Sequence, residues 1–243
     1  TPLVEWLCNE ITKDTKGNSK IAILTRGYKT TQNSKLKTQN YVDEPALLAE
    51  NCPGVNVVIN PKRVIGASEA IGKYGSNVLI MDDGFQHRRL ARNLDIIAID
   101  ATCPFGYGRI IPAGLLREPI NSLKRAHAAV ITRCDQVAEE KLRKIENNLK
   151  NIKPELPVAR SIHKAVHIKT IDDKQIELEN FENKKVFAFC GIGNPDSFIK
   201  TLKNIHYVVA GSKIYDDHHN YKDNCLADLS KQSQNLGAEI ILT

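Results

Sequence analysis

Short apolar runs alternate with polar, helix-like stretches along most of this 243-residue chain. β-Branched and other apolar residues dominate the runs, which predicts buried strands. In the first part of the chain the predicted strands span residues 21–24, 57–59, 78–81, 95–99 and 128–131. Helical patterns at residues 45–50 and 137–150 accompany them. Strands that alternate with helices are typical of an α/β fold with a mostly parallel sheet.

The pattern changes after Pro154 and Pro157. Residues 158–183 alternate apolar and polar without a helical period, which predicts a β-ribbon linker. A second α/β unit follows, with predicted strands at 185–190, 207–210 and 238–242 and predicted helices at 196–205 and 226–236. We therefore expect a first domain over residues 1–157, a linker over 158–183 and a second, smaller α/β domain over 184–243.

The first predicted helix begins at Thr1, and the last predicted strand runs to the end of the chain. A parallel α/β domain normally opens with a strand that feeds its first helix. We therefore expect this sequence to be a fragment that lacks residues at both ends.

Composition narrows the class of protein. Hydrophobic residues make up 42% of the chain, which indicates a globular protein and excludes a disordered one. All apolar runs are shorter than the ~20 residues that span a bilayer. The six cysteines show no C-x-x-C spacing, which argues against a zinc site or a disulfide framework and favours a reducing compartment.

The net charge of +6 fits a phosphate-rich ligand, an anionic membrane surface or a nucleic acid. Lysine dominates the basic residues, which is also typical of an ordinary solvated surface. Aromatic residues make up only 6% of the chain, and no nucleic-acid-binding motif stands out, so we expect no nucleic-acid partner.

The most informative segment is Asp82-Asp83-Gly84-Phe85-Gln86-His87-Arg88-Arg89, directly after the strand predicted over 78–81. Ligands of open α/β sheets bind outside the carboxyl ends of the strands. Adjacent carboxylates repel each other unless a cation lies between them, and Mg²⁺ prefers one or two carboxylates together with phosphate oxygens. Asp82 and Asp83 are therefore candidate metal ligands. The alternative is a charged turn with solvated arginines.

Two shorter segments carry weaker signals. Arg26 precedes a turn at Gly27, where a planar guanidinium is placed to bind a phosphate. Asp43 and Glu44 precede Pro45 at the start of a predicted helix. Either carboxylate suits a helix N-cap, and the functional alternative is a general base at the helix entrance.

Two loops add further candidates. The Gly/Pro-rich loop over residues 104–119 follows a strand; its Arg109 and Arg117 suit phosphoryl charge, and its Glu118 suits a cation. The alternative is a rigid surface loop. Residues 215–221 place Asp next to His, which orients an imidazole or raises its basicity, and the alternative is a polar loop.

These segments, in this order, resemble the tetraacyldisaccharide 4'-kinase family, which phosphorylates the lipid A precursor in Gram-negative bacteria. The resemblance covers nearly the whole chain, and its most specific element is Asp-Asp-Gly-Phe-Gln-His at 82–87. It also rests on Thr-Arg-Gly-Tyr (25–28), Asp-Glu-Pro (43–45), Pro-Ala-Gly-Leu-Leu-Arg-Glu-Pro (112–119), Gly-Ile-Gly-Asn-Pro (191–195) and Asp-His-His (217–219).

The resemblance implies a fold, an activity and a location. The fold is a P-loop-kinase-like, mostly parallel sheet domain joined by a β-ribbon linker to a second, smaller α/β domain. The activity is phosphorylation of the 4'-hydroxyl of a tetraacyldisaccharide 1-phosphate, with ATP and Mg²⁺. The enzyme is expected to lie peripherally on the cytoplasmic face of the bacterial inner membrane, with this glycolipid as substrate and no obligate protein partner.

The resemblance also assigns metal ligands. Thr1 resembles the phosphate-loop hydroxyl, which lies at the nucleotide and ligates Mg²⁺. Asp82 and Asp83 resemble the Walker-B-type acids near Mg²⁺, and Glu118 resembles a metal-proximal carboxylate.

Catalytic and nucleotide-binding roles follow in the same way. Asp43 resembles the catalytic base, with His218 as its cross-domain partner, and Arg117 resembles a phosphate-proximal arginine. Arg26 and Gln86 complete the candidates for nucleotide binding. The resemblance predicts that Asp43 accepts the proton of the 4'-hydroxyl, whose oxygen attacks the γ-phosphorus in line.

The family's phosphate loop ends in Gly-Lys-Thr-Pro, and Thr1-Pro2 matches only its last two residues. The backbone cradle and the Lys that hold the β- and γ-phosphates are absent from the sequence, as are the family's membrane-contacting segment and its C-terminal Thr-Glu-Lys-Asp element. We therefore expect this fragment to be inactive alone.

A rival prediction from another class is a P-loop NTPase that acts as a nucleotide-dependent switch or scaffold. Thr132-Arg133-Cys134-Asp135, after a strand, weakly resembles a guanine-reading turn. Lys is usual at the position of Arg133, which weakens this prediction.

Overall fold

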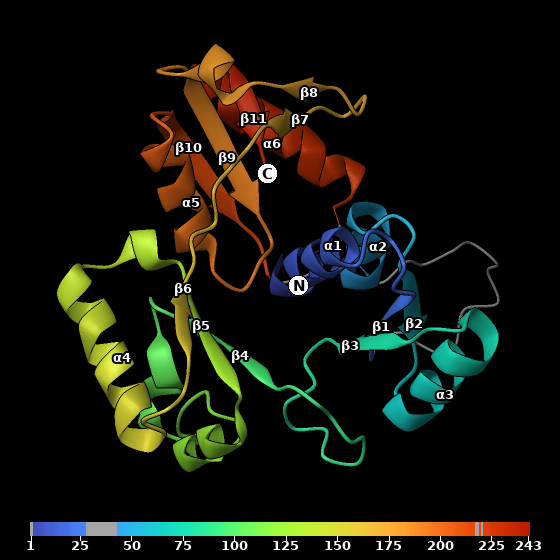
Figure 1. Cartoon of the computed structure of the whole chain (residues 1–243). Coiled ribbons are helices and arrows are strands. Elements are labelled where there is room, and N and C mark those ends of the chain that lie inside the picture. Colours follow the sequence, from blue (N-terminus) through green and yellow to red (C-terminus); the bar gives the residue numbers. More distant parts are fainter. Residues whose placement is uncertain (1, 28–42, 217–218, 220) are drawn as a thin grey trace. The chain divides into compact units, whose positions relative to one another are not determined.

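The computed structural model describes residues 2–27, 43–216, 219 and 221–243. The chain forms two compact units, and Figure 1 shows their helices and strands. Unit 1 comprises Thr1–Ile99, Cys103–Val130 and Glu146–Ala159, and unit 2 comprises Asp100–Thr102, Ile131–Ile145 and Arg160–Thr243. The predicted α/β fold with mostly parallel sheets is confirmed. The domain boundaries expected from the sequence stay a prediction.

The helices and strands follow the predicted alternation. The helices are α1 (Pro2–Asp14), α2 (Asp43–Asn51), α3 (Arg63–Tyr74), α4 (Glu139–Ile152), α5 (Pro195–Asn204) and α6 (Asp223–Asn235). The strands are β1 (Ile21–Thr25), β2 (Asn56–Ile59), β3 (Val78–Met81), β4 (Ile96–Asp100), β5 (Ala128–Thr132), β6 (Val158–Arg160), β7 (Ile168–Lys169), β8 (Gln175–Ile176), β9 (Lys185–Cys190), β10 (Val208–Ile214) and β11 (Ile240–Leu242). Short 3₁₀ segments are η1 (Pro104–Gly108), η2 (Ile120–Arg125), η3 (Cys134–Gln136) and η4 (Leu178–Phe181).

Strand β1 is the centre of the sheet in unit 1. The strand order is β2-β1-β3, and both neighbours run parallel to β1. Alternate residues of a strand face opposite sides of the sheet. Ile21 and Ile23 therefore join the core under α1 and α2, and Ala22 and Leu24 join the core under α3. Figure 1 shows the two layers of helices on either side of β1 to β3.

Helix α3 is missing from the sequence-based prediction, and its packing explains why. It buries the small residues Gly66, Ala67 and Ala70 against the sheet. Its larger apolar side chains, including Val64 and Ile71, are exposed. Because the hydrophobic side chains do not mark the buried face, the apolar period that identifies most surface helices is absent here.

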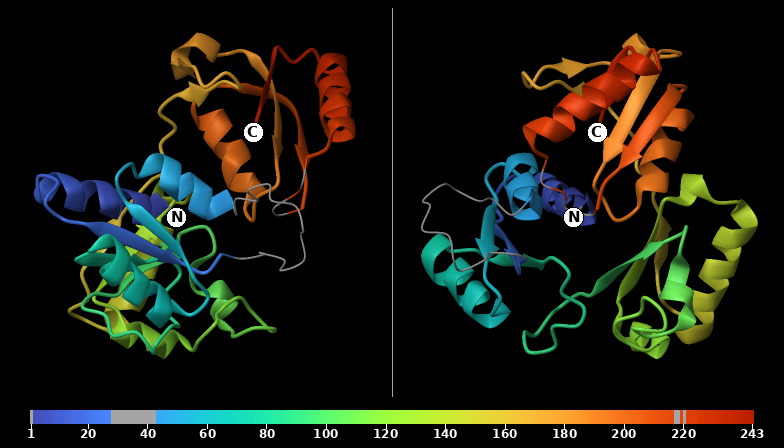
Figure 2. Two further views of the ribbon diagram at one scale, coloured as in Figure 1. Left: turned by 90° about the vertical axis from the view of Figure 1, so that its right-hand side faces the viewer. Right: turned by 180° about the vertical axis from the view of Figure 1, so that it is seen from behind.

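Strand β9 is the centre of the sheet in unit 2, which has the order β10-β9-β11 with both pairs parallel. Val186 and Ala188 of β9 pack with Leu202 of α5 in one core cluster. Helix α6 contacts all three strands. Figure 2 shows α5 and α6 on opposite faces of this sheet.

The segment predicted as a ribbon divides into two parts. Residues Val158–Arg160 form β6, the outer strand of a sheet with the order β4-β5-β6. Strands β7 and β8 form a two-stranded antiparallel ribbon. The sequence pattern could not separate the two, because both parts alternate apolar and polar residues.

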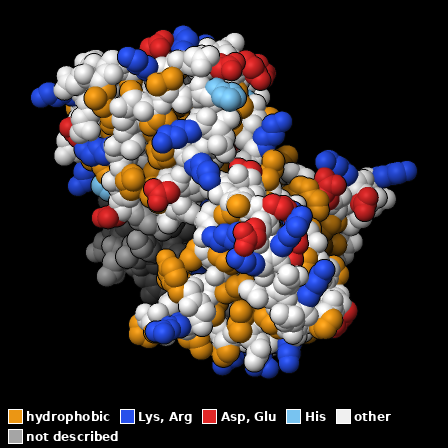
Figure 3. Space-filling view, turned by 90° about the vertical axis from the view of Figure 1, so that its left-hand side faces the viewer, with side chains coloured by type: hydrophobic (Ala, Val, Ile, Leu, Met, Phe, Trp, Pro, Cys, Tyr) orange, Lys and Arg blue, Asp and Glu red, His pale blue; other side chains and the backbone are white. Residues whose placement is uncertain are grey.

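Surface chemistry adds two observations. Among the described residues, no helix is both long and apolar enough to cross a membrane. On the face drawn in Figure 3, the Lys and Arg side chains of the described residues are interspersed with acidic and apolar ones and form no continuous basic stripe.

The packing of α3 predicts opposite results at two of its glycines. A Cβ at Gly72 meets no atom within 4 Å, so we expect Gly72→Ala to stabilise the protein by about 0.5–1 kcal/mol through the loss of backbone freedom in the unfolded chain. The matched control is Gly66→Ala, whose Cβ would lie 3.2 Å from Cβ of Asn60, closer than ordinary van der Waals contact, so we expect crowding to outweigh the gain. Chemical denaturation measures both. Equal stabilisation by the two variants would contradict this packing.

Candidate active site

The carboxyl ends of β1, β2 and β3 meet at one edge of the sheet in unit 1. The Asn60 amide donates a hydrogen bond to the Thr25 carbonyl at 3.0 Å, and the Asp82 amide donates to the Leu24 carbonyl at 3.0 Å. These bonds extend the ladder one residue beyond β2 and β3. They place the segment that begins at Asp82 directly beside the end of β1, where ligands of parallel sheets bind.

Arg63, at the start of α3, ties two of these strand ends together. Its Nη1 donates to the Asn60 carbonyl at 3.0 Å, and its Nη2 donates to the Asp82 carbonyl at 3.3 Å. The residue is only 6% exposed, so these hydrogen bonds offset the cost of removing the guanidinium from water. Arg63 thereby fixes the backbone of Asp82 relative to β2.

Asp82 lies half-buried at this edge, among other acids. Burial is the largest cause that raises its pKa above the ordinary range of a carboxyl, and the carboxylates of Glu44 and Asp83 raise it further. Glu44 belongs to the first turn of α2. The fold therefore brings the entrance of α2 and the end of β3 into one electrostatic environment.

The chain turns sharply after Asp82. Asp83 adopts a φ of 49°, in the left-handed region, and the His87 amide donates to the Gly84 carbonyl at 2.9 Å. A Cβ at Gly84 would lie 2.7 Å from Cγ and Sδ of Met81, so a side chain at this position would displace Met81. The glycine lets the turn fold back closely against the end of β3.

Two consecutive loop residues, Arg117 and Glu118, hold this turn from outside. Nη1 of Arg117 donates to the two carboxylate oxygens of Asp83 at 2.7 and 2.6 Å. Nε2 of Gln86 donates to Oε1 of Glu118 at 3.0 Å. The Arg117 and Asp83 side chains are 54% and 46% exposed, so this ion pair contributes at most about 1 kcal/mol to stability. It fixes geometry more than it stabilises the fold.

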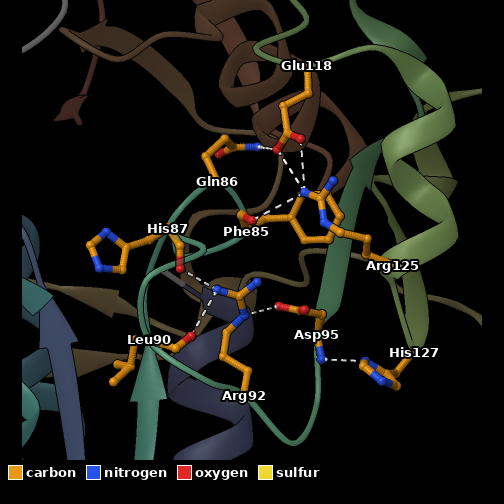
Figure 4. Close-up of polar contacts among 9 residues, drawn as sticks. All are labelled: Phe85, Gln86, His87, Leu90, Arg92, Asp95, Glu118, Arg125 and His127. Atoms are coloured by element: carbon orange, nitrogen blue, oxygen red, sulfur yellow. Dashed lines mark hydrogen bonds and ion pairs between the residues drawn. The ribbon is translucent and has the colours of Figure 1, made fainter. Parts of the chain in front are cut away.

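Arg125, at the end of η2, completes the contacts of Glu118. Figure 4 shows its Nη2 donating to both carboxylate oxygens of Glu118, at 3.0 and 2.9 Å. Burial alone would raise the pKa of Glu118, but hydrogen bonds from Arg125, Ser122 and Gln86 outweigh burial and lower it. Glu118 is therefore ionised at neutral pH.

His87 sits at the far end of the turn as a neutral imidazole. Burial is the largest cause that lowers its pKa, and the positive charges of Arg63, Arg89, Arg92 and Arg26 lower it further. Its Nε2 is buried and finds no hydrogen-bond partner among the residues that the structure describes. Several arginines around one neutral ring make a positive environment that favours an anionic ligand.

The segment between this turn and β4 is anchored by Arg92. Its Nε lies 2.7 Å from Oδ1 of Asp95, and its Nη1 donates to the His87 carbonyl (Figure 4). The Asp95 amide in turn donates to Nδ1 of His127 at 2.9 Å. The Arg92 and Asp95 side chains are both largely buried, so this ion pair is better shielded from water than the pair of Arg117 and Asp83.

Unit 2 carries the other segments that the sequence singled out. In the Gly-Ile-Gly-Asn-Pro segment, Oδ1 of Asn194 accepts from the Ser197 amide at 3.1 Å and caps α5, which is a structural role. The ring of His219 stacks on Tyr215 with centroids 4.4 Å apart and meets Tyr221 edge-on at 5.1 Å. Arg133, from the turn that weakly resembles a guanine-reading turn, forms an ion pair with Asp100.

Comparison with known proteins shows the family of this chain. The family profile described as Tetraacyldisaccharide-1-P 4'-kinase matches residues 1–243. The chain belongs to the tetraacyldisaccharide 4'-kinase family. A protein of Desulfotalea psychrophila named Tetraacyldisaccharide 4'-kinase is 35% identical over 91% of this chain and 66% of its own length. One of the same name from Anaeromyxobacter is 33% identical over 92% of this chain and 63% of its own length.

A solved structure agrees with the sequence match. A crystal structure described as the "apo" form of LpxK from Aquifex aeolicus in complex with ATP matches with a TM-score of 0.66 and 28% sequence identity. The match covers 90% of this chain and 68% of that one. The present chain thus spans about two thirds of the length of the kinase-family proteins that it matches.

The structure gathers several residues that the kinase-family resemblance singles out. The strand edge and its turn bring together Arg26, Asp82, Asp83, Gln86, Arg117 and Glu118 within unit 1. Asp43 begins α2 beside Glu44, and its side chain is not described. Thr1 and His218 lie outside the described residues. The catalytic, nucleotide-binding and metal-binding roles of all these residues stay predictions.

The fit of a divalent cation differs among the predicted ligands. Among the described residues, no three His, Cys, Asp or Glu side chains converge as a ready metal site. Asp83 and Glu118 each already carry an arginine. The carboxylates of Glu44 and Asp83 act on Asp82, and a divalent cation at this place would offset the repulsion among the three acids.

Sequence reasoning missed three residues of this kinase-family site. Arg63 could have been noticed from its position as the first residue of α3. A basic residue at a helix N-terminus is unfavourable with the helix dipole, which indicates another role. The sequence around Glu44 indicates only a helix cap or a base. Its effect on the pKa of Asp82 depends on tertiary structure. Arg125 leaves no signal in the sequence, since it follows Lys124 in what resembles a solvated basic surface.

The environment of Asp82 predicts a pH-dependent gain in stability. Because folding raises the pKa of Asp82, its ionised form opposes folding at neutral pH, and this opposition disappears as the pH falls through the raised pKa towards the ordinary 3.8. We expect Asp82→Asn to stabilise the metal-free protein at pH 7 by roughly 0.5–2 kcal/mol, the usual gain from removing an unfavourable charge. The gain shrinks in acid.

Thermal unfolding at several pH values measures this effect. The matched variant is Asp83→Asn in the same turn. It removes one of the two acids that raise the pKa of Asp82 but also loses the ion pair with Arg117, so its gain is expected to be smaller. A gain for Asp82→Asn that is constant with pH would show that the raised pKa of Asp82 is not its cause.

Proposed function

We propose that the protein containing this chain transfers the γ-phosphoryl group of ATP to the 4'-hydroxyl of a tetraacyldisaccharide 1-phosphate. The observation that carries the proposal is the kinase-family match over residues 1–243. The ATP complex of the Aquifex aeolicus protein supports the nucleotide, and the names of the curated relatives support the acceptor. The products are ADP and the 4'-phosphorylated glycolipid.

In this proposal Asp43 is the general base that accepts the proton of the 4'-hydroxyl. It opens α2 next to Glu44, whose carboxylate acts on Asp82. A base at this helix entrance therefore belongs to the same strand edge as the proposed phosphate site. The assistance of His218 rests on the family resemblance alone.

Magnesium is proposed to bind at Asp82, the acid on which the carboxylates of Glu44 and Asp83 act. Asp82 would hold the ion, and Mg²⁺ would there supply positive charge that offsets the negative charge of the phosphoryl groups during transfer. The chain's own residues prepare this site. Arg63 fixes the backbone of Asp82, and Arg117 holds Asp83 at the neighbouring position.

Magnesium binding at Asp82 predicts a stability effect that needs no turnover. A cation that binds the folded state stabilises it by RT ln(1 + [L]/Kd), so magnesium chloride at ten times Kd adds about 1.4 kcal/mol. We expect this increase in wild-type protein and its loss in Asp82→Asn, measured by thermal unfolding. Calcium-free sodium chloride of equal ionic strength is the control, and an equal response of both proteins to magnesium would contradict the assignment.

The peripheral location at the inner membrane is part of the proposal. An acceptor with four acyl chains is a membrane lipid. The surface feature that supports this location is η1 together with the loop after it, where Tyr107, Ile110, Ile111 and Leu115 are 76%, 45%, 58% and 61% exposed. The positively charged Arg109 accompanies them, and apolar side chains beside a basic residue suit an anionic lipid surface.

The rival function, a nucleotide-dependent switch or scaffold, makes a different biochemical prediction. The kinase consumes ATP in proportion to added tetraacyldisaccharide 1-phosphate, whereas a switch hydrolyses nucleotide without lipid and can prefer GTP. The side chain of Arg133 is engaged by Asp100, an arrangement that gives no support to guanine reading. Nucleotide consumption with and without the lipid separates the two functions.

The base assignment predicts a large loss of turnover in one variant. Removing a general base typically costs 10²–10⁴-fold in rate, so we expect Asp43→Ala in the complete protein to lose about that factor in kcat while ATP still binds. The matched control is Glu50→Ala at the other end of α2, which keeps wild-type turnover. Wild-type turnover in Asp43→Ala would remove Asp43 from the mechanism.

A further inference from the structure

Arg125 makes an unusual set of contacts for a residue with no assigned role. Beyond its two hydrogen bonds to Glu118, its Cζ lies 4.5 Å from the centroid of the Phe85 ring. Its Nη2 also lies 3.5 Å from the Phe85 carbonyl. Figure 4 shows Arg125 reaching from its own segment to both the ring of Phe85 and the carboxylate of Glu118.

These contacts converge on the turn that carries the two acids. Phe85 is two residues after Asp83, and Gln86 reaches Glu118 through its amide. Glu118 is also the neighbour of Arg117, which binds Asp83. Through one guanidinium, the segment at residues 120–125 thus contacts the middle of the turn and holds Glu118, the neighbour of the loop residue that binds the start of the turn.

We propose that Arg125 is a positioning residue for phosphoryl transfer: it aligns the turn after β3 and the Arg117-Glu118 pair with each other. This inference rests on the proposed function. The site residue that Arg125 contacts directly is Glu118. Its effect on the reaction therefore passes through Glu118 and through the Phe85-Gln86 backbone.

The chemistry of guanidinium explains why an arginine occupies this place. Its edge donates to a carboxylate while its flat face lies over an aromatic ring, and these two uses do not compete. A lysine ammonium is a compact point charge that can satisfy the carboxylate but cannot also cover the ring in the same geometry. The side chains of Arg125 and Glu118 are 29% and 21% exposed, so water competes less here than at the pair of Arg117 and Asp83.

The kinetic test compares Arg125→Ala and Arg125→Lys with wild type in the complete protein. Misplacement of about 1 Å at an active site can cost 10²-fold in rate, so we expect Arg125→Ala to lower kcat by about 10- to 100-fold with little change in KM for ATP. Arg125→Lys is expected to recover only part of this loss. Millimolar guanidinium chloride is expected to restore part of the kcat of Arg125→Ala, because a free guanidinium can occupy the vacated place.

A second measurement does not depend on turnover. Amide hydrogen exchange of residues 84–87 is expected to accelerate in Arg125→Ala while the exchange of β1 stays at the wild-type rate. The matched control is Lys153→Met, which removes a 2.8 Å hydrogen bond to the Ala126 carbonyl at the end of the same segment but touches neither Glu118 nor Phe85. It is expected to keep wild-type kcat and wild-type exchange at 84–87.

The outcomes separate this inference from the proposed function. Unchanged exchange at residues 84–87 in Arg125→Ala, unchanged kcat, or equal loss of kcat in Lys153→Met would overturn the positioning role. If the wild-type protein shows no lipid-dependent phosphoryl transfer, the proposed function fails. The exchange measurement then still decides whether Arg125 holds the turn.

Discussion

A buried positive charge at the carboxyl edge of the β2-β1-β3 sheet organises unit 1. Arg63 reaches the carbonyls at the ends of two strands, and its burial makes both hydrogen bonds obligatory because an unpaired guanidinium would be costly there. The strand ends cannot separate without breaking them. Together with the hydrogen bond from the Asp82 amide to the Leu24 carbonyl, this side chain fixes the place where the turn begins.

The three acids of the site differ in the charges that surround them. Asp83 is neutralised by Arg117, and Glu118 is neutralised by Arg125. The carboxylates of Glu44 and Asp83 act on Asp82 and raise its pKa. The fold thus gathers several carboxylates at one place on the strand edge. Such a concentration of charge lowers stability in the absence of a cation, and functional sites commonly carry a cost of this kind.

Much of this architecture could be predicted from the sequence, for identifiable reasons. Strands such as β1 and β9 are buried on both faces, so their unbroken apolar runs are visible in the sequence. The position of Asp82 at the end of a strand could be predicted because Asp82 directly follows an apolar run. Helix α3 escaped prediction because small residues form its buried face. The arginine partners of Asp83 and Glu118 could not be predicted because each contact joins segments whose approach depends on the tertiary fold.

The central position of β1 has a consequence for synthesis. Both strands that pair with it, β2 and β3, follow it in the chain, and all five of its residues end up buried. During synthesis of the segments that follow β1, the Ile-Ala-Ile-Leu-Thr run has no partner strand. Its apolar side chains and unpaired backbone groups are then exposed and prone to aggregation. The nascent protein is therefore vulnerable to misassociation until β3 emerges, and a chaperone that binds apolar stretches would protect it in that interval.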